Sequence, residues 1–256
     1  MLDPSPFLST RRLGRRFVFV SETGSTNNIA ADAPEWSVVA ADAQTAGRGR
    51  LGHSWQSPPG ENLYFTAVFG CEGIEAAEAA TLPLAAGLAV ALALQSIAAG
   101  RGAPSGGFGM KWPNDILSGG KKICGILCER HGERILAGVG VNVNQRSFPP
   151  DISARASSLL GCCGGQEFDR SRCLAAVLDS MENVYNRWKD GGFAAVYPQI
   201  AAIDLLKGKT VSIVQTDADP EPFRGVCRGI APDGSLDVAG RRFYAGEAHV
   251  SGIGAD

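Results

Sequence analysis

Runs of apolar residues divide the first two thirds of the chain into predicted strands and helices. Residues 17–20, 37–44 and 62–70 are rich in β-branched and aromatic side chains, which is typical of strands. Three further strand-like runs, "MKWPNDIL", "KKICGILCER" and "RILAGVGVNVN", are separated only by "SGG" and "HGE". Gaps this short join antiparallel neighbours, so we predict hairpins and a largely antiparallel sheet.

Two longer segments have the periodicity of helices. The first, 79–100, has no charged residue and is long enough to span a bilayer. Pro83, Gly87 and Gln95 interrupt it, however, and leucines recur at every fourth position, so we predict a buried core helix. The second helix carries an apolar stripe, begins after Asp169 as its N-cap and ends at Gly191-Gly192.

The composition changes near residue 204. From there on, four short β runs with turns such as Asp233-Gly234 between them predict a small antiparallel barrel. We therefore divide the chain into an N-terminal extension (1–16), a catalytic domain (17–203) and a C-terminal domain (204–256). The expected fold class is α+β, with a mixed, largely antiparallel sheet covered by helices.

Charge and cysteine content narrow the function classes. The 24 Lys and Arg residues against 26 Asp and Glu residues give a net charge of −2, which argues against a protein that coats nucleic acid or an anionic membrane. The seven cysteines include no C-x-x-C, and the N-terminus has no apolar signal segment. Both observations favour a reducing, cytoplasmic location.

The stretch "QTAGRGRLGHSW", residues 44–55, concentrates glycine and positive charge. Its glycines allow close approach to a ligand, and Arg48 and Arg50 offer planar forks for phosphate or carboxylate. The spacing matches neither the P-loop nor the dinucleotide-binding fingerprint. Taken alone, the stretch is better explained as an Arg-Gly loop exposed to solvent, and contact with RNA is a second alternative.

Two more segments carry polar groups beside predicted strands. In "KWPND", 111–115, the proline requires a strand end or edge, and an ordinary Asx turn is the alternative explanation. Lys121 and Lys122 precede an apolar strand, where a surface lysine is the default. The histidines form no metal-binding pattern, and G-x-S-x-G is absent.

The order of these motifs, "STN", "QTAGRGRLGHSW", "KWPNDI", "KKICGIL" and "GVGVNVN", resembles the bacterial biotin–protein ligases from about Phe17 to the C-terminus. The resemblance implies a class II synthetase-like catalytic domain followed by an SH3-like barrel. It implies ATP, biotin and Mg²⁺ as reactants and a biotin carboxyl carrier domain of acetyl-CoA carboxylase, or a related carboxylase, as acceptor. The expected chemistry forms biotinyl-5′-AMP and then transfers biotin to a lysine.

The resemblance also assigns residues. Lys122, Arg48 and Arg50 are expected to be catalytic, and Asp115 is the candidate Mg²⁺ ligand. The expected biotin-binding residues are Ser25, Thr26, Asn27, Gln44, Gly47, Arg48, Gly49, Arg50, Trp55, Lys122 and Gly125. The expected ATP-binding residues are Arg50, Lys111, Asn114, Asp115, Asn142 and Arg228.

The sequence departs from the family pattern at two positions. Gly24 stands where an acid often precedes S-T-N, and His53 stands where Arg or Lys is usual, so the loop loses a permanent charge. Only about sixteen residues precede the first strand, so we expect no DNA-binding domain and no repressor activity. We expect no membrane association, because the apolar segment 79–100 fits a buried helix better. The expected partners allow a monomer or a homodimer. The rival functions are a lipoate ligase or octanoyltransferase, and a nucleic-acid-binding module.

Overall fold

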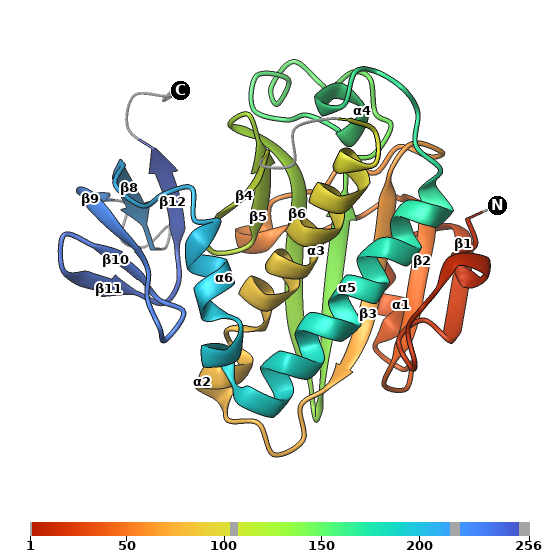
Figure 1. Cartoon of the computed structure of the whole chain (residues 1–256), viewed down its shortest axis with the longest axis horizontal. Coiled ribbons are helices and arrows are strands. Elements are labelled where there is room, and N and C mark those ends of the chain that lie inside the picture. The colour runs from red at the N-terminus through yellow and green to blue at the C-terminus, as the bar shows by residue number, and fades with distance from the viewer. Residues whose placement is uncertain (1, 103–106, 216–220, 251–256) are drawn as a thin grey trace.

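The computed structural model describes residues 2–102, 107–215 and 221–250, which form two sheets (Figure 1). The larger sheet has seven strands, and only the pair formed by its first two is parallel. In spatial order the strands are β1 (Arg16–Thr23), β2 (Ser37–Gln44), β3 (Leu63–Gly70), β7 (Arg134–Val141), β6 (Lys121–His131), β5 (Asp115–Ser118) and β4 (Phe108–Lys111). The predicted α+β class with a mixed, largely antiparallel sheet is confirmed.

Two long helices lie against each other over one face of this sheet (Figure 1). Helix α3 (Leu82–Ala99) begins with Pro83 in its first turn and is buried along most of its length. Together with α2 (Ala76–Ala79) it is long and apolar enough to cross a membrane, but 67% of that stretch is buried inside the protein. The predicted core helix is therefore confirmed.

Helix α5 (Arg170–Gly191) covers α3 and also begins and ends as predicted. The Asp169 carboxylate accepts hydrogen bonds from the backbone N–H groups of Ser171 and Arg172, and Gly192 ends the helix at φ 66°. Short helices complete the fold: α1 (Thr26–Ala30), α4 (Leu159–Cys162) and α6 (Tyr197–Ala202).

Two predicted strands proved to be pairs of strands. The run 110–117 is split into β4 and β5, an antiparallel hairpin with a cis Trp112–Pro113 peptide bond in its turn. A proline has no N–H to donate to a ladder, so the strand stops there and its polar neighbours lie at the turn. The last β run is likewise divided between β11 (Arg241–Phe243) and β12 (Glu247–Val250).

The second sheet is antiparallel and has five strands, in keeping with the SH3-like barrel expected. Its order is β11, β10 (Leu236–Val238), β9 (Phe223–Ile230), β8 (Thr210–Val214) and β12. Parts of the predicted elements, residues 103–106 of the connection after α3 and 251–256 of the C-terminal domain, lie outside the described residues.

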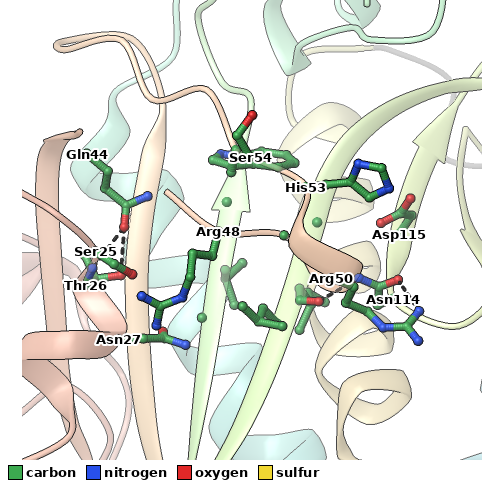
Figure 2. Close-up of a pocket in the computed structure, with 18 of the residues that line it drawn as sticks. Ser25, Thr26, Asn27, Gln44, Arg48, Arg50, His53, Ser54, Asn114 and Asp115 are labelled. Carbon is green, nitrogen blue, oxygen red and sulfur yellow. Dashed lines mark hydrogen bonds between the residues drawn. The ribbon is translucent and has the colours of Figure 1, made fainter. Parts of the chain in front are cut away.

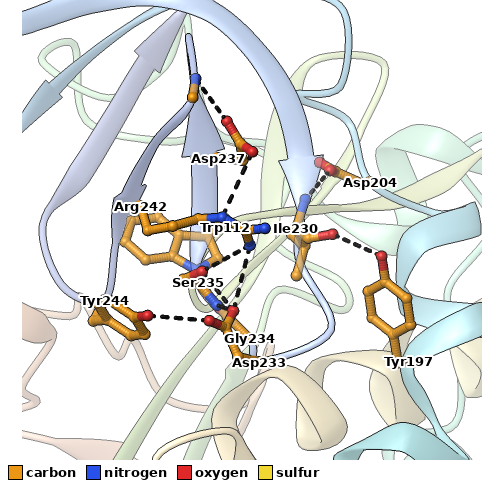
Figure 3. Close-up of polar contacts among 11 residues, drawn as sticks. Trp112, Tyr197, Asp204, Ile230, Asp233, Gly234, Ser235, Asp237, Arg242 and Tyr244 are labelled. Atoms are coloured by element: carbon orange, nitrogen blue, oxygen red, sulfur yellow. Dashed lines mark hydrogen bonds and ion pairs between the residues drawn. The ribbon is translucent and has the colours of Figure 1, made fainter.

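Hydrogen bonds connect the second sheet to the part of the chain that contains the larger sheet (Figure 3). The indole N–H of Trp112 donates to the carbonyl oxygen of Gly234 at 3.1 Å, and the Tyr197 hydroxyl donates to that of Ile230 at 3.2 Å. The Asp204 carboxylate accepts from the Ile230 N–H at 2.9 Å. The turn of the β4–β5 hairpin is thus attached directly to the second sheet.

The predicted N-terminal extension is packed against α5. Leu2 and Leu13 are buried, and β1 begins at Arg16. The Glu182 carboxylate of α5 accepts three backbone hydrogen bonds, from Arg11, Arg12 and Leu13, at 2.7–3.0 Å. One buried acid therefore holds the turn that leads into the sheet.

Candidate active site

The principal pocket lies over β6 and β7 and is covered in part by the loop that follows β2 (Figure 2). It is formed by the start of α1 with the end of β2, by the β4–β5 turn with β6 and β7, by Glu247 of β12, and by the loop 47–55, which we call the lid. The pocket is lined by Ser25, Thr26, Asn27, Gln44, Arg48, Gly49, Arg50, His53, Ser54, Trp55, Asn114, Asp115, Lys122, Gly125, Ile126, Leu127, Gly138, Val139, Gly140 and Glu247. The structure thus brings together twelve of the residues predicted from the sequence.

One end of the pocket is lined mainly by side-chain amides and hydroxyls; we call it the amide end, after Asn27 and Gln44. The backbone N–H of Thr26 donates to Oε1 of Gln44 at 2.9 Å, and the Thr26 hydroxyl lies 3.3 Å from the same oxygen. Behind them, the buried Thr66 hydroxyl contacts both Thr26 and Asn27. These side chains are held in a connected network with both donors and acceptors.

The opposite end of the pocket carries cations around one carboxylate. Lys122 Nζ lies 2.7 Å from Asp115 Oδ1, and Lys111 is the cross-strand partner of Asp115 in the β4–β5 hairpin. Burial lowers the pKa of Lys111, the nearby Lys122 lowers it further, and Asp115 opposes the shift. Asn114 occupies the turn, where its Nδ2 donates to the Ile126 carbonyl at 2.7 Å.

The lid folds back on itself between these two ends. The backbone N–H of Trp55 donates to the Gly47 carbonyl at 2.8 Å, and the backbones of Arg48 and Ser54 form an isolated antiparallel bridge. Arg50 reaches the other way, to Asn114 Oδ1 at 3.4 Å and to the Gly246 carbonyl at 3.3 Å. Burial lowers the pKa of Arg50, and the carboxylates of Glu247 and Asp115 oppose that shift.

The Trp55 ring lies directly on two glycines of the sheet. Gly125 of β6 and Gly140 of β7 are cross-strand partners. A Cβ added to Gly125 would lie 2.8 Å from the indole, and a Cβ added to Gly140 would lie 2.7 Å from its Cζ2 atom, so a side chain at either position would collide with the ring. Lys122 Nζ lies 5.3 Å from the ring centroid, within range of a cation–π contact. The Trp55 Nε1–H is buried and has no hydrogen-bond acceptor among the described residues, an unusual state for a buried donor.

Four predicted residues do not line the pocket. Gly47 lies next to the pocket, at a place where a side chain would collide with the Trp55 carbonyl. Lys111 does not line the pocket, but its cross-strand partner Asp115 does. Asn142 is buried, with its Nδ2 donating to the Ser157 carbonyl at 2.9 Å, and Arg228 is exposed on β9. Their assignment to ATP or biotin stays a prediction.

Sequence reasoning missed a contribution from the second sheet. Glu247 of β12 enters the pocket and lies 3.3 Å from the lid residue His53, with its other oxygen 3.6 Å from His249. Burial lowers the pKa of His249, and the nearby Lys111 lowers it further. No spacing rule connects positions nearly two hundred residues apart, so only the packing of the two sheets reveals this contact.

Comparisons with known proteins agree with this geometry. Residues 19–145 match the Biotin/lipoate A/B protein ligase family. The biotin–[acetyl-CoA-carboxylase] ligase of Mycobacterium tuberculosis is 33% identical over 237 residues, which cover 89% of this chain and 85% of that protein. The chain belongs to the biotin–protein ligase family. Among solved structures, this ligase-family chain resembles the Aquifex aeolicus biotin protein ligase in complex with biotin and ATP, with a TM-score of 0.79 and 28% identity over 92% of this chain and 98% of that one.

Longer relatives in the same family are matched only in part. The bifunctional ligase/repressor BirA of Bacillus spizizenii is 33% identical over 201 residues, and the match covers 59% of its length. The shared part includes 74% of this biotin–protein ligase family member.

Proposed function

We propose that the protein joins biotin to a lysine of a biotin carboxyl carrier domain in two steps, using ATP. The observation that carries this proposal is the division of one pocket into an end lined by amides and hydroxyls and an end with Lys122 and Arg50 around Asp115, with the lid across both. Biotin has a cyclic urea at one end, which needs hydrogen-bond donors and acceptors together, and a carboxylate at the other end, which needs cations. The two ends of the pocket offer these two environments.

In the first step, a biotin carboxylate oxygen attacks the α-phosphorus of ATP, and the bond to pyrophosphate breaks. Negative charge grows on the phosphoryl oxygens, where Lys122 and Arg50 stabilise it. Asp115 holds the Lys122 ammonium in place before the reaction, so little reorganisation is needed. Binding both reactants in one pocket supplies the proximity.

In the second step, the amine of the acceptor lysine attacks the acyl carbon of biotinyl-5′-AMP. The amine loses a proton, the C–O bond to phosphate breaks, and AMP leaves. The enzyme supplies no nucleophile in either step. Lys122 and Arg50 stay near the phosphate, and the Trp55 Nε1–H would be one more donor to an oxygen of the adenylate.

Mg²⁺ would enter with ATP as part of the substrate. No group of three or more His, Cys, Asp or Glu side chains suited to a metal occurs in the described part of the chain. Mg²⁺ bound to nucleotides commonly uses one or two carboxylates plus phosphate oxygens. Asp115 is the pocket carboxylate beside the lysines that would serve the phosphates, so it would complete such a site.

The acceptor we propose is the carrier domain of acetyl-CoA carboxylase, because the M. tuberculosis relative is named for that reaction. All seven cysteines are free thiols, which supports a cytoplasmic location. The lipoate ligases are the alternative within the wider family, and the amide end is the observation that disfavours them. The dithiolane ring of lipoate has no N–H or C=O group, so it would leave the polar groups of the amide end without ligand partners.

Mass spectrometry tests the proposal directly. A carrier domain incubated with the protein, biotin, ATP and Mg²⁺ should gain one biotin on a lysine, and biotin should support exchange between ATP and pyrophosphate. Exchange with lipoate and none with biotin would overturn the assignment.

A further inference from the structure

Glu129 of β6 lies just outside the pocket and joins its amide end to the lid. Its Oε2 accepts a hydrogen bond from Asn27 Nδ2 at 2.5 Å and forms an ion pair with Arg48 Nη2 at 3.2 Å. We propose that Glu129 is a positioning residue for biotin specificity, which fixes the orientation of the Asn27 amide and holds Arg48 beside it. This inference rests on the proposed function and deepens it.

The chemistry of the carboxylate determines the orientation of Asn27. An ionised carboxylate accepts hydrogen bonds and cannot donate one, so Asn27 must direct its NH₂ toward Glu129. The Asn27 Oδ1 then faces Thr66, whose hydroxyl donates to it at 2.5 Å. A flipped amide would place Oδ1 against the carboxylate, where two acceptors face each other with no hydrogen between them.

The fixed amide orients its neighbours in turn. Thr66 Oγ1 lies 2.8 Å from Thr26 Oγ1, and Thr26 contacts Gln44 Oε1 through both its N–H and its hydroxyl. The Gln44 Nε2 therefore points to Ser57 Oγ, at 3.1 Å. Glu129 thus determines the orientation of Asn27 and, through it, of the Thr66 hydroxyl, while the backbone N–H of Thr26 fixes Gln44.

Such fixed polarity discriminates between ligands. The two ureido N–H groups of biotin require acceptors at defined places, and a ring without them leaves those acceptors unpaired. If the Asn27 amide could turn freely, the amide end would accept the wrong polarity at lower cost. Glu129 therefore acts on selectivity and affinity for the ureido ring and leaves the chemical step at the far end of the pocket unchanged.

The contact with Arg48 adds a link to the lid. Arg48 also donates to Asn28 Oδ1 at 3.0 Å, so its guanidinium lies beside Asn27 in the free protein (Figure 2). The two side chains of the ion pair are 42% and 33% exposed, and an exposed pair contributes only ~0–1 kcal/mol. The pair therefore adds little to stability, and the short contact with Asn27 dominates the role of Glu129.

Three variants and one control test the inference. Glu129→Gln keeps the size of the side chain but can donate as well as accept; Glu129→Asp keeps the charge on a shorter stem; and Glu129→Ala removes both. Glu167→Gln is the control, because Glu167 forms an exposed pair with Arg146 at 2.9 Å and does not line the pocket. Each variant is assayed by biotin-dependent ATP–pyrophosphate exchange at saturating ATP, together with its melting temperature.

We expect Glu129→Gln to raise the KM for biotin about tenfold, equivalent to about 1.4 kcal/mol, with kcat within about twofold of wild type. Its preference for biotin over an N-methylated ureido analogue should fall by a similar factor, and Glu129→Asp should recover part of the loss. Melting temperatures should match those of wild type and Glu167→Gln.

An unchanged KM and unchanged selectivity in Glu129→Gln would overturn the inference. So would a loss of kcat at constant KM, or a parallel loss of stability that explains the kinetics. The measurements of KM and of ligand selectivity both require that the wild-type protein catalyse biotin-dependent ATP–pyrophosphate exchange. Its failure to do so would overturn the proposed function instead, so the two failures are distinguishable.

Discussion

The ammonium group of Lys122 and the carboxylate of Asp115 lie 2.7 Å apart on neighbouring strands, at the end of the pocket opposite Ser25 and Gln44. The Lys122 side chain also faces the Trp55 ring. Two rigid strands and one lid residue therefore hold this amine in place in the free protein. Preorganised charge of this kind lowers a transition-state barrier more than it strengthens ground-state binding.

Replacing Lys122 should therefore affect the chemical step most. We expect Lys122→Ala to reduce adenylate formation about 100-fold or more, by analogy with the loss of one oxyanion donor, and to weaken biotin binding less than about tenfold. Pyrophosphate exchange and equilibrium binding measure the two effects. Lys121→Ala is the matched control, since Lys121 is the exposed neighbour on the same strand. Wild-type turnover in Lys122→Ala would refute the assigned role.

The lid should be cleavable in the free protein and protected by ligand. Arg50 is held by two long hydrogen bonds of 3.3 and 3.4 Å, and Leu51 is 57% exposed. Limited trypsin digestion should cut after Arg48 or Arg50 without ligand, and biotin with ATP should slow this cleavage about tenfold or more, as expected for a loop that orders over its ligand. Equal cleavage rates with and without ligand would count against a lid that closes.

The contact of Trp55 with the glycine pair is open to a graded test. Trp55→Phe keeps most of the buried ring but loses the N–H, so we expect about a 3- to 10-fold loss in kcat/KM, the value of one hydrogen bond. Gly140→Ala should cost more, because its Cβ would displace the indole from the sheet. Gly24→Ala has open space around its Cβ and serves as the control. A Gly140→Ala variant as active as Gly24→Ala would show that the ring need not lie there.

The buried acid under the N-terminal segment predicts a pH dependence of stability. Burial raises the pKa of Glu182, but the backbone hydrogen bonds from Leu13, Arg12 and Arg11 and the charge of Arg12 outweigh it, so the net pKa is lowered. A lowered pKa gives stability that is present above the unfolded value of about 4.3 and is lost as pH falls through the folded pKa.

Glu182→Gln should remove this stability at neutral pH, by about 1–3 kcal/mol, because the amide has one acceptor oxygen and no charge, so at least one of the three N–H groups loses its acceptor. Urea unfolding at pH 7 and at pH 3 provides the measurement. The difference between wild type and variant should be large at pH 7 and small at pH 3. A difference independent of pH would contradict the ionised role of Glu182.

Periodicity and turn chemistry anticipated most of the fold. The apolar helix over α3, the capped α5 and the β6–β7 hairpin follow from local pattern, and Asp169 capped the helix it was expected to cap. The split at Trp112-Pro113 was missed, although the proline carried the signal, because hydrophobicity continues on both sides of it. Local rules identify elements better than they identify where one element becomes two.

The candidate site was predicted less evenly. The family resemblance, carried by short contiguous motifs, pointed to the loop 47–55, Lys122 and Asp115, and the structure brings them to one pocket. The roles of Gly140, Glu247 and Glu129 depend on the register between strands and on how the second sheet docks, and neither is written in any single segment. Long-range geometry decides these contacts, and a sequence read in windows does not contain it.

The attachment of Trp112 to Gly234 has a practical consequence. The same three-residue turn carries Asn114 toward the pocket and holds the second sheet, which in turn supplies Glu247. A chain divided near Leu205 would therefore leave an incomplete pocket in each piece. Two such fragments fused to interacting proteins would form a split reporter, in which biotin transfer marks the moment when the halves meet.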